Sequence, residues 1–154
     1  MTRPLDAANS PPIFRIGLFA LIFDDEERVL LGHRRDIDWW NLPGGGMEAG
    51  ETVDEALRRE VHEETGLEVE VIQLVGVYSK PQKREVVLTF RCRITGGTLH
   101  PTEEIRESHY FAPDALPENI LPKHRQRVED AMLHQQSAVI RAQRTSTEED
   151  QGIS

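Results

Sequence analysis

The sequence predicts a single α/β domain in which helices pack against a mixed sheet. The chain has 154 residues, the usual size of one compact domain, and no internal repeat or linker divides it. Apolar runs typical of strands alternate with two segments of helical periodicity. We expect residues 1–12 to be a flexible lead-in, residues 13–140 to form the domain, and the polar residues 141–154 to be a disordered tail.

The first strand is predicted over the near-continuous apolar run from Phe14 to Phe23, which is typical of a strand covered on both faces. An acidic turn at 24–27 leads to a returning strand at 28–34. A loop is expected at 36–50, because this stretch holds two tryptophans, a proline and three consecutive glycines.

A helix is predicted over residues 52–65, and both of its ends are marked. Thr52 and Glu55 have the spacing of a capping box, and Gly66 can adopt the left-handed conformation that ends a helix. Beyond this helix we expect strands at 67–78 and 85–95, a short strand at 108–111, and a second helix at 123–136.

The charge balance excludes some partners. The chain has 18 basic and 27 acidic side chains, a formal charge of −9. Long nucleic acids bind to basic surfaces, so we expect no polymeric nucleic acid partner. An acidic protein can still bind phosphates if a metal ion reverses the local charge.

Cys92 is the only cysteine, which excludes an internal disulfide and a cysteine-rich zinc site. Its spacing from Phe90 and Ile94 places it in the core.

No targeting or membrane segment is evident. Residues 1–12 are polar and lack an apolar signal core, and the longest apolar stretch, residues 16–23, is too short to span a bilayer. We therefore expect a cytoplasmic protein that does not contact the membrane.

The predicted helix at 52–65 carries carboxylates in unusual places. At about 100° per residue, its apolar stripe consists of Val53, Ala56, Leu57 and Val61. Glu60 and Glu64 fall inside this stripe and Glu63 lies at its edge, so two carboxylates point toward the protein body, where an unpaired charge is costly. A solvated acidic face is the usual explanation of a glutamate-rich helix, but it does not account for this orientation.

These three glutamates also lie at the negative end of the helix dipole, where carboxylates are unfavourable. Their spacing of three and four residues brings them together on one surface. A divalent cation would compensate both effects, and all-oxygen ligands favour Mg²⁺ or Mn²⁺ over zinc. Because Mg²⁺ commonly combines one or two carboxylates with water and phosphate oxygens, the glycine-rich loop before the helix points to phosphate chemistry.

The segment around this helix resembles the Nudix box. The box has a glycine, five residues, a glutamate, seven residues, and then Arg-Glu-apolar-x-Glu-Glu-x-Gly-apolar. The matching residues are Gly45, Glu51, Arg59, Glu60, Val61, Glu63, Glu64, Gly66 and Leu67. The resemblance implies an α/β/α sandwich with a central mixed sheet, and hydrolysis of a nucleoside diphosphate linked to a moiety X. ADP-ribose-like molecules and nucleoside triphosphates are the leading small-nucleotide candidates.

The resemblance also implies roles for individual residues. Glu60 and Glu64 are similar to the principal metal ligands, Glu63 to a further ligand or a carboxylate behind it, and the Gly44 carbonyl to a backbone ligand. Arg59 is similar to an arginine that orients Glu51.

The implied reaction is attack of water on phosphorus, assisted by two or more metal ions. The general base is either Glu64 or a residue of the 102–107 loop, where Glu104 is preferred. A solvated acidic loop is the alternative for that segment.

Three residues outside the box are candidate substrate contacts. Arg34 follows the second strand, where it could contact a phosphate or ribose, and Trp40 and Tyr78 could stack on a base. Each has a structural alternative: a solvated strand end for Arg34 and a place in the core for the two aromatic residues.

Two other function classes compete with the hydrolase. A catalytically silent nucleotide-binding module would not need the intact glutamates. An isoprenoid diphosphate isomerase would need an active-site cysteine, whereas Cys92 has core spacing. The resemblance also makes a homodimer a candidate assembly, because homodimers are common in the family.

Overall fold

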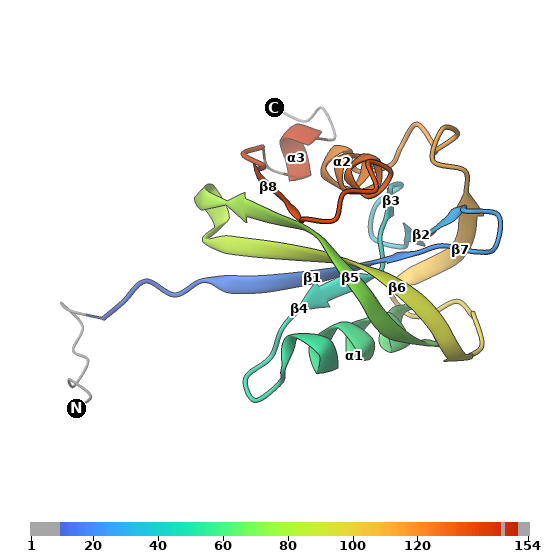
Figure 1. The fold of residues 1–154 in the computed structure, drawn as a ribbon, viewed down its shortest axis with the longest axis horizontal. Helices are drawn as coiled ribbons and strands as arrows, with labels where there is room; N and C mark the ends of the chain where they lie inside the picture. The colour runs from blue at the N-terminus through green and yellow to red at the C-terminus, as the bar shows by residue number, and fades with distance from the viewer. Residues whose placement is uncertain (1–9, 146, 151–154) are drawn as a thin grey trace.

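The computed structural model describes residues 10–145 and 147–150. These residues form two sheets and three α-helices (Figure 1). The larger sheet has the strand order β4 (Gly44–Gly46), β1 (Arg15–Ile22), β6 (Glu85–Gly97), β5 (Leu67–Lys80) and β8 (Val139–Ala142). The smaller sheet has the order β3 (Trp40–Asn41), β2 (Val29–Arg34) and β7 (Ile105–Phe111). The helices are α1 (Val53–Thr65), α2 (Pro122–Ala131) and α3 (Thr147–Asp150), with a 3₁₀ turn at Pro81–Lys83.

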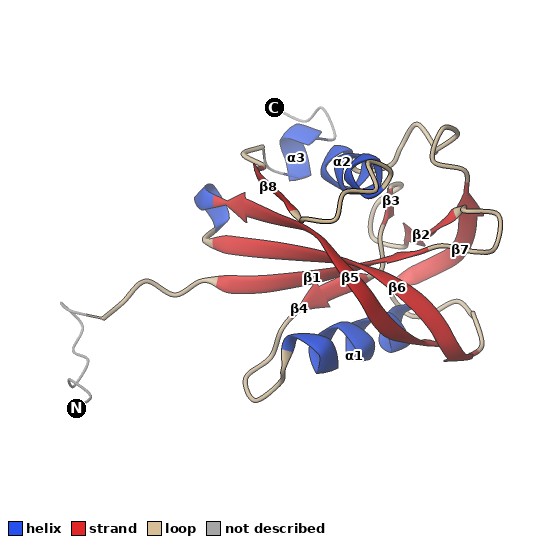
Figure 2. Ribbon diagram, viewed as in Figure 1, coloured by secondary structure: helices blue, strands red, loops and turns tan. Residues whose placement is uncertain are grey.

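The larger sheet is mixed. Strand β1 runs parallel to β6 and antiparallel to β4, and β5 runs antiparallel to β6 and parallel to β8. Helix α1 covers one face and α2 the opposite face (Figure 2). The predicted α/β class with a central mixed sheet and helices on both faces is therefore confirmed.

Strand β1 is buried on both faces, as its apolar composition predicts. Leu18, Ala20 and Ile22 belong to the core cluster beneath α1, together with Leu57 and Val61. Leu21 faces the other way, into the cluster that packs against α2. Alternate side chains of one strand thus join the two halves of the core.

Helix α1 begins and ends where the sequence predicts. The Thr52 hydroxyl accepts a hydrogen bond from the Glu55 amide, and the Glu55 carboxylate accepts one from the Thr52 amide. Gly66 ends the helix with φ of 83°, a left-handed conformation that glycine adopts without strain. These caps fix the first and last turns of the helix.

The N-terminal part differs from the prediction in two ways. Strand β2 does not form a ladder with β1: an isolated bridge joins Phe23, just after β1, to Val29, and β2 pairs with β7 and β3 instead. The loop expected at 36–50 contains the short strands β3 and β4. Both differences arise from long-range pairing, which local sequence patterns do not specify.

The C-terminal part also differs. Residues 141–154 were expected to be disordered, but β8 pairs with β5, Gln143 is buried, and α3 covers residues 147–150. Helix α2 ends at Ala131, earlier than predicted. Ser10 to Pro12 have no regular structure; the rest of the expected lead-in, and residues 151–154 of the tail, lie outside the described residues. No helix in the described ranges is long and apolar enough to cross a membrane.

Cys92 lies in the core cluster beneath α1 and is 4% exposed, as its spacing predicts. Burial, with a smaller contribution from Asp54, raises the pKa of its thiol to about 12. A buried, protonated thiol is a poor nucleophile, so the isomerase alternative has no suitable cysteine.

Candidate active site

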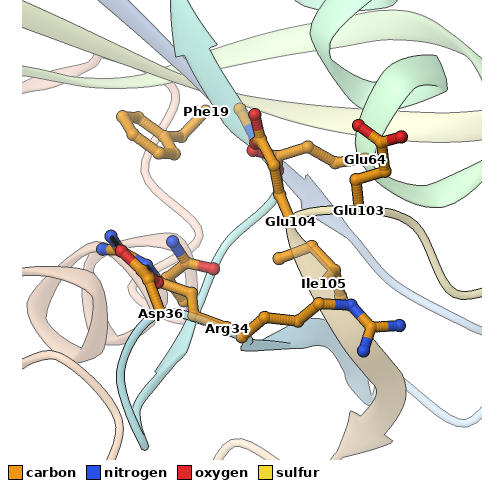
Figure 3. Close-up of a pocket in the computed structure, with 10 residues that line it drawn as sticks. Phe19, Arg34, Asp36, Glu64, Glu103, Glu104 and Ile105 are labelled. Atoms are coloured by element: carbon orange, nitrogen blue, oxygen red, sulfur yellow. Dashed lines mark hydrogen bonds and ion pairs between the residues drawn. The ribbon is translucent and has the colours of Figure 1, made fainter.

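A cavity of about 610 Å³ opens where α1, the end of β2 and the loop before β7 meet (Figure 3). Its glutamates come from two elements: Glu64 from α1, and Glu103 and Glu104 from the loop before β7. The other lining residues are Phe19, Arg34, Arg35, Asp36, Asn41, Gly44 and Ile105. Glu104 is thus brought next to the helix of the predicted metal ligands, 40 residues away in sequence.

Glu64 is the most buried of these carboxylates, with 9% of its surface exposed. Its Oε2 accepts a hydrogen bond of 3.0 Å from the amide of Gly44 in β4. Burial, together with the nearby charges of Glu104 and Glu60, raises its pKa to about 8, although the Gly44 hydrogen bond opposes this shift. Without added positive charge, this carboxyl group therefore holds its proton at neutral pH.

Arg59 donates hydrogen bonds to three other carboxylates near the site. Its Nε and Nη2 donate to the two carboxylate oxygens of Glu51, at 2.6 and 2.9 Å. Its Nη1 donates to Glu60 at 2.9 Å and to Glu63 at 3.3 Å. The Arg59 hydrogen bonds lower the pKa of Glu51 to about 2. The contact between Arg59 and Glu51 is the one that the sequence resemblance implies, and the arginine also neutralises part of the acidic cluster.

Gly45 leaves the space that the Glu60 carboxylate occupies. A Cβ atom at this position would lie 2.5 Å from the Glu60 carboxyl carbon. At Gly46, by contrast, a Cβ would meet nothing within 4 Å. The glycine-rich strand β4 therefore approaches α1 closely at one residue, and that residue is the first glycine of the box.

This donor set fits a hard divalent cation. Glu60 and Glu64 are recessed on one helix face, with side chains 16% and 9% exposed, and burial raises the pKa of both carboxyl groups. Among the described residues, no group of three aspartate, glutamate, histidine or cysteine side chains is close enough to hold a metal ion by itself. Mg²⁺ does not require one, because it retains water and takes substrate phosphates as ligands. Glu63 is more exposed, at 56%, which suits a peripheral place.

Arg34 lies in the cavity, where its Nε donates to Asp36 at 2.9 Å. Its charge also lowers the pKa of Glu64, in opposition to burial. Asn41 and Phe19, which we did not predict, line the same cavity, and the buried Asn41 Oδ1 has no hydrogen-bond partner. Phe19 is next to Leu18 in β1, so its side chain points to the opposite face of the sheet, and this could have indicated its position. No sequence signal identifies Asn41.

Two predicted substrate contacts are corrected. Trp40 is 8% exposed and stacks on His33 with ring centroids 4.7 Å apart, so it packs in the core, as its structural alternative has it. Tyr78 is fully buried and its hydroxyl donates to Asp130 at 2.7 Å. Burial is also the main cause that raises its pKa. Neither ring is accessible to a nucleobase.

Comparison with known proteins identifies the family. The NUDIX domain model matches residues 13–131. The chain belongs to the Nudix family of hydrolases. It is 35% identical over 132 residues to a MutT-like protein of Streptomyces ambofaciens, covering 86% of this chain and 85% of the relative. It is 31% identical over 115 residues to a Bacillus subtilis protein provisionally named 8-oxo-dGTP diphosphatase, covering 74% of this chain and 77% of that protein.

The solved structures agree with this family. The structure of a UDP-X diphosphatase superimposes with a TM-score of 0.74 at 26% identity, covering 86% of this chain and 70% of that one. The Nudix fold predicted from the box is therefore confirmed. The relatives' names refer to different nucleotides, so family membership alone does not specify one substrate.

Proposed function

We propose that this Nudix hydrolase uses a divalent cation, Mg²⁺ or Mn²⁺, to cleave the diphosphate linkage of a nucleoside diphosphate joined to a moiety X. The observation that carries the proposal is that buried Glu64 and Glu104 line one cavity, and that the charges of Glu104 and of Glu60 raise the pKa of Glu64. Such a cluster is costly without a cation, and a cation there would attract a diphosphate. ADP-ribose-like molecules and nucleoside triphosphates both carry the required linkage.

We assign separate roles in metal binding and in positioning to the residues of the site. Glu60 and Glu64 would hold the cation, with Glu63 and the Gly44 carbonyl at its margin, and the Gly44 amide orients the Glu64 carboxylate. Arg59 holds Glu51 and Glu60 in position. Divalent cations in sites of this kind polarise phosphate oxygens and activate water.

Glu104 is our candidate for the general base. It lines the cavity from the loop side and is close enough to raise the pKa of Glu64. A carboxylate there would accept a proton as the water oxygen bonds to phosphorus and the bond from phosphorus to the bridging oxygen breaks. Glu64 is less suited, because it is buried and already accepts the Gly44 hydrogen bond.

A substrate panel tests this proposal. Product release is measured for nucleoside triphosphates, ADP-ribose, nucleotide sugars and dinucleoside polyphosphates, with Mg²⁺, with Mn²⁺ and with chelator. We expect metal-dependent turnover of one class. Binding of a nucleotide without turnover of any would contradict the enzyme and support the silent binding module.

A matched pair of variants tests the base. Glu104→Gln should lower kcat by about 100-fold or more, whereas Glu103→Gln, the neighbouring residue in the same cavity, should change it little. The reverse order of effects would show that the base is elsewhere.

The expected homodimer and cytoplasmic location stay predictions.

A further inference from the structure

A second cavity, of about 430 Å³, lies beside the first and is strongly basic. The two share Phe19, Arg34 and Asn41, and the second extends between β4 and α2. Its charged lining consists of Arg15, Arg34, Lys80, Lys123 and Arg127, against Asp150 and Glu85, which forms an ion pair with Lys80 at 2.9 Å. This excess of positive charge stands out in a protein with a formal charge of −9.

Arg127 forms the buried floor of this second cavity. It is 1% exposed, and its guanidinium lies over the rings of Phe19 and Tyr78, 5.0 and 5.4 Å from their centroids. Its Nη2 donates to a neutral acceptor, the amide oxygen of Gln143, and its buried Nε has no hydrogen-bond partner. Burial lowers its pKa to about 10, so the side chain remains charged at neutral pH. The charges of Glu85 and Asp150 partly compensate this buried guanidinium, and an anion in the cavity would compensate it further.

His124 supplies a second unsatisfied donor. Its Nδ1 lies 3.0 Å from the Leu42 amide and accepts its hydrogen bond. Burial, and then the charge of Arg127, keep the pKa of His124 well below its usual value, so the ring is neutral and carries its proton on Nε2. That Nε2 lies 3.3 Å from Arg127 Nη1. Two donors face each other there, and an acceptor supplied by a ligand would satisfy both.

The chain places one of its own carboxylates at this cavity. Asp150, from α3, forms an ion pair with Lys123, and the two side chains are only 7% and 8% exposed. The other carboxylate oxygen of Asp150 accepts a hydrogen bond from the Thr145 hydroxyl at 2.6 Å. Helix α3 has only four residues, so a competing ligand would have to displace a short segment.

We propose that this second cavity binds a phosphate monoester carried by the substrate, and that Asp150 occupies the Lys123 side of the site until the phosphate displaces it. The inference rests on the proposed function, because the diphosphate to be cleaved is assigned to the adjoining acidic cavity. It adds a substrate class: nucleotides that bear a phosphate in addition to the diphosphate linkage.

Phosphate binding without turnover is the first test. The melting temperature is measured against inorganic phosphate, in chelator and at constant ionic strength, for wild type, Lys123→Gln, Asp150→Asn and the exposed control Lys83→Gln. Lys123→Gln should weaken phosphate binding by about tenfold, Asp150→Asn should strengthen it, and Lys83→Gln should match wild type. Lys80→Gln, also in the lining, repeats the test if Lys123→Gln folds poorly. Equal phosphate affinity in all variants would overturn the site.

Turnover distinguishes substrate phosphate from product phosphate. With Mg²⁺, the nucleotide that is turned over is compared with its derivative bearing one added ribose phosphate. If the phosphate belongs to the substrate, Lys123→Gln raises KM about tenfold for the phosphorylated nucleotide alone and leaves kcat near wild type. If KM is unchanged and only inhibition by free phosphate is lost, the substrate assignment is wrong. Because the first test requires no turnover, an inactive protein that binds phosphate would contradict the proposed function without contradicting this site.

Discussion

Replacing Glu64 by glutamine should stabilise the metal-free protein at neutral pH. In the folded state the pKa of Glu64 is raised from 4.5 to about 8, mainly by burial. As the pH rises above 4.5 the unfolded chain releases this proton first, so the folded state loses stability progressively until the pH passes about 8. Glutamine carries no charge at any pH and can still accept the Gly44 hydrogen bond.

The size of the effect follows from the shift. At about pH 7.5 the penalty is on the order of 4 kcal/mol as an upper limit, from about 1.4 kcal/mol per pH unit. A domain of this size changes its Tm by about 2–4 °C per kcal/mol, so Glu64→Gln should melt several degrees above wild type in chelator. Near pH 5 the two proteins should melt almost together.

Thermal unfolding in chelator at the two pH values is the assay, and Glu63→Gln, 56% exposed, is the matched control. Glu63→Gln should change the Tm little at either pH. Saturating Mg²⁺ should raise the Tm of wild type more than that of Glu64→Gln. A Glu64→Gln protein that is no more stable than wild type at pH 7.5 in chelator would refute the assignment of a costly buried carboxylate.

Three further predictions concern the neighbours of this residue. Arg59→Lys should lower kcat by about tenfold or more, because lysine cannot hold both oxygens of Glu51, and steady-state kinetics with circular dichroism would separate this loss from unfolding. Gly45→Ala should reduce activity and raise the Mg²⁺ concentration needed for half-maximal rate, whereas Gly46→Ala should do neither; equal effects of the two would contradict the close approach of β4 to α1. Cys92 should react with a thiol reagent only after unfolding, and fast labelling of the native protein would show that it is not buried.

Helix α1 could be predicted from sequence because its determinants are local. The capping residues and Gly66 fix its ends, and the angular position of Glu60 and Glu64 within the apolar stripe places them toward the interior. The box spacing then supplied the roles proposed for Arg59 and Glu51, whose contact the structure contains.

The core position of Tyr78, the structural alternative to base stacking, is the one the structure shows, but simple alternation along strand β5 could not decide between the two because its pairing is irregular. Its register with β6 shifts at three places, and each shift changes which side chains face the core, so simple alternation misleads. The second cavity was hidden for a related reason: Lys123 and Asp150 meet only after β8 pairs with β5, and the polar composition of that segment gave no sign of the pairing. In both cases the environment of the residue depends on long-range contacts, which the local sequence does not show.

The rate of hydrolysis as a function of Mg²⁺ concentration tests the central claim most directly, measured on wild type, Glu60→Gln and Glu64→Gln with the nucleotide identified by the panel. We predict no turnover in chelator, a rate that rises with Mg²⁺ in wild type, and a loss of about 100-fold or more in each variant that excess Mg²⁺ does not restore. Turnover in chelator, or wild-type rates in both variants, would contradict a metal-dependent hydrolase built on these two glutamates.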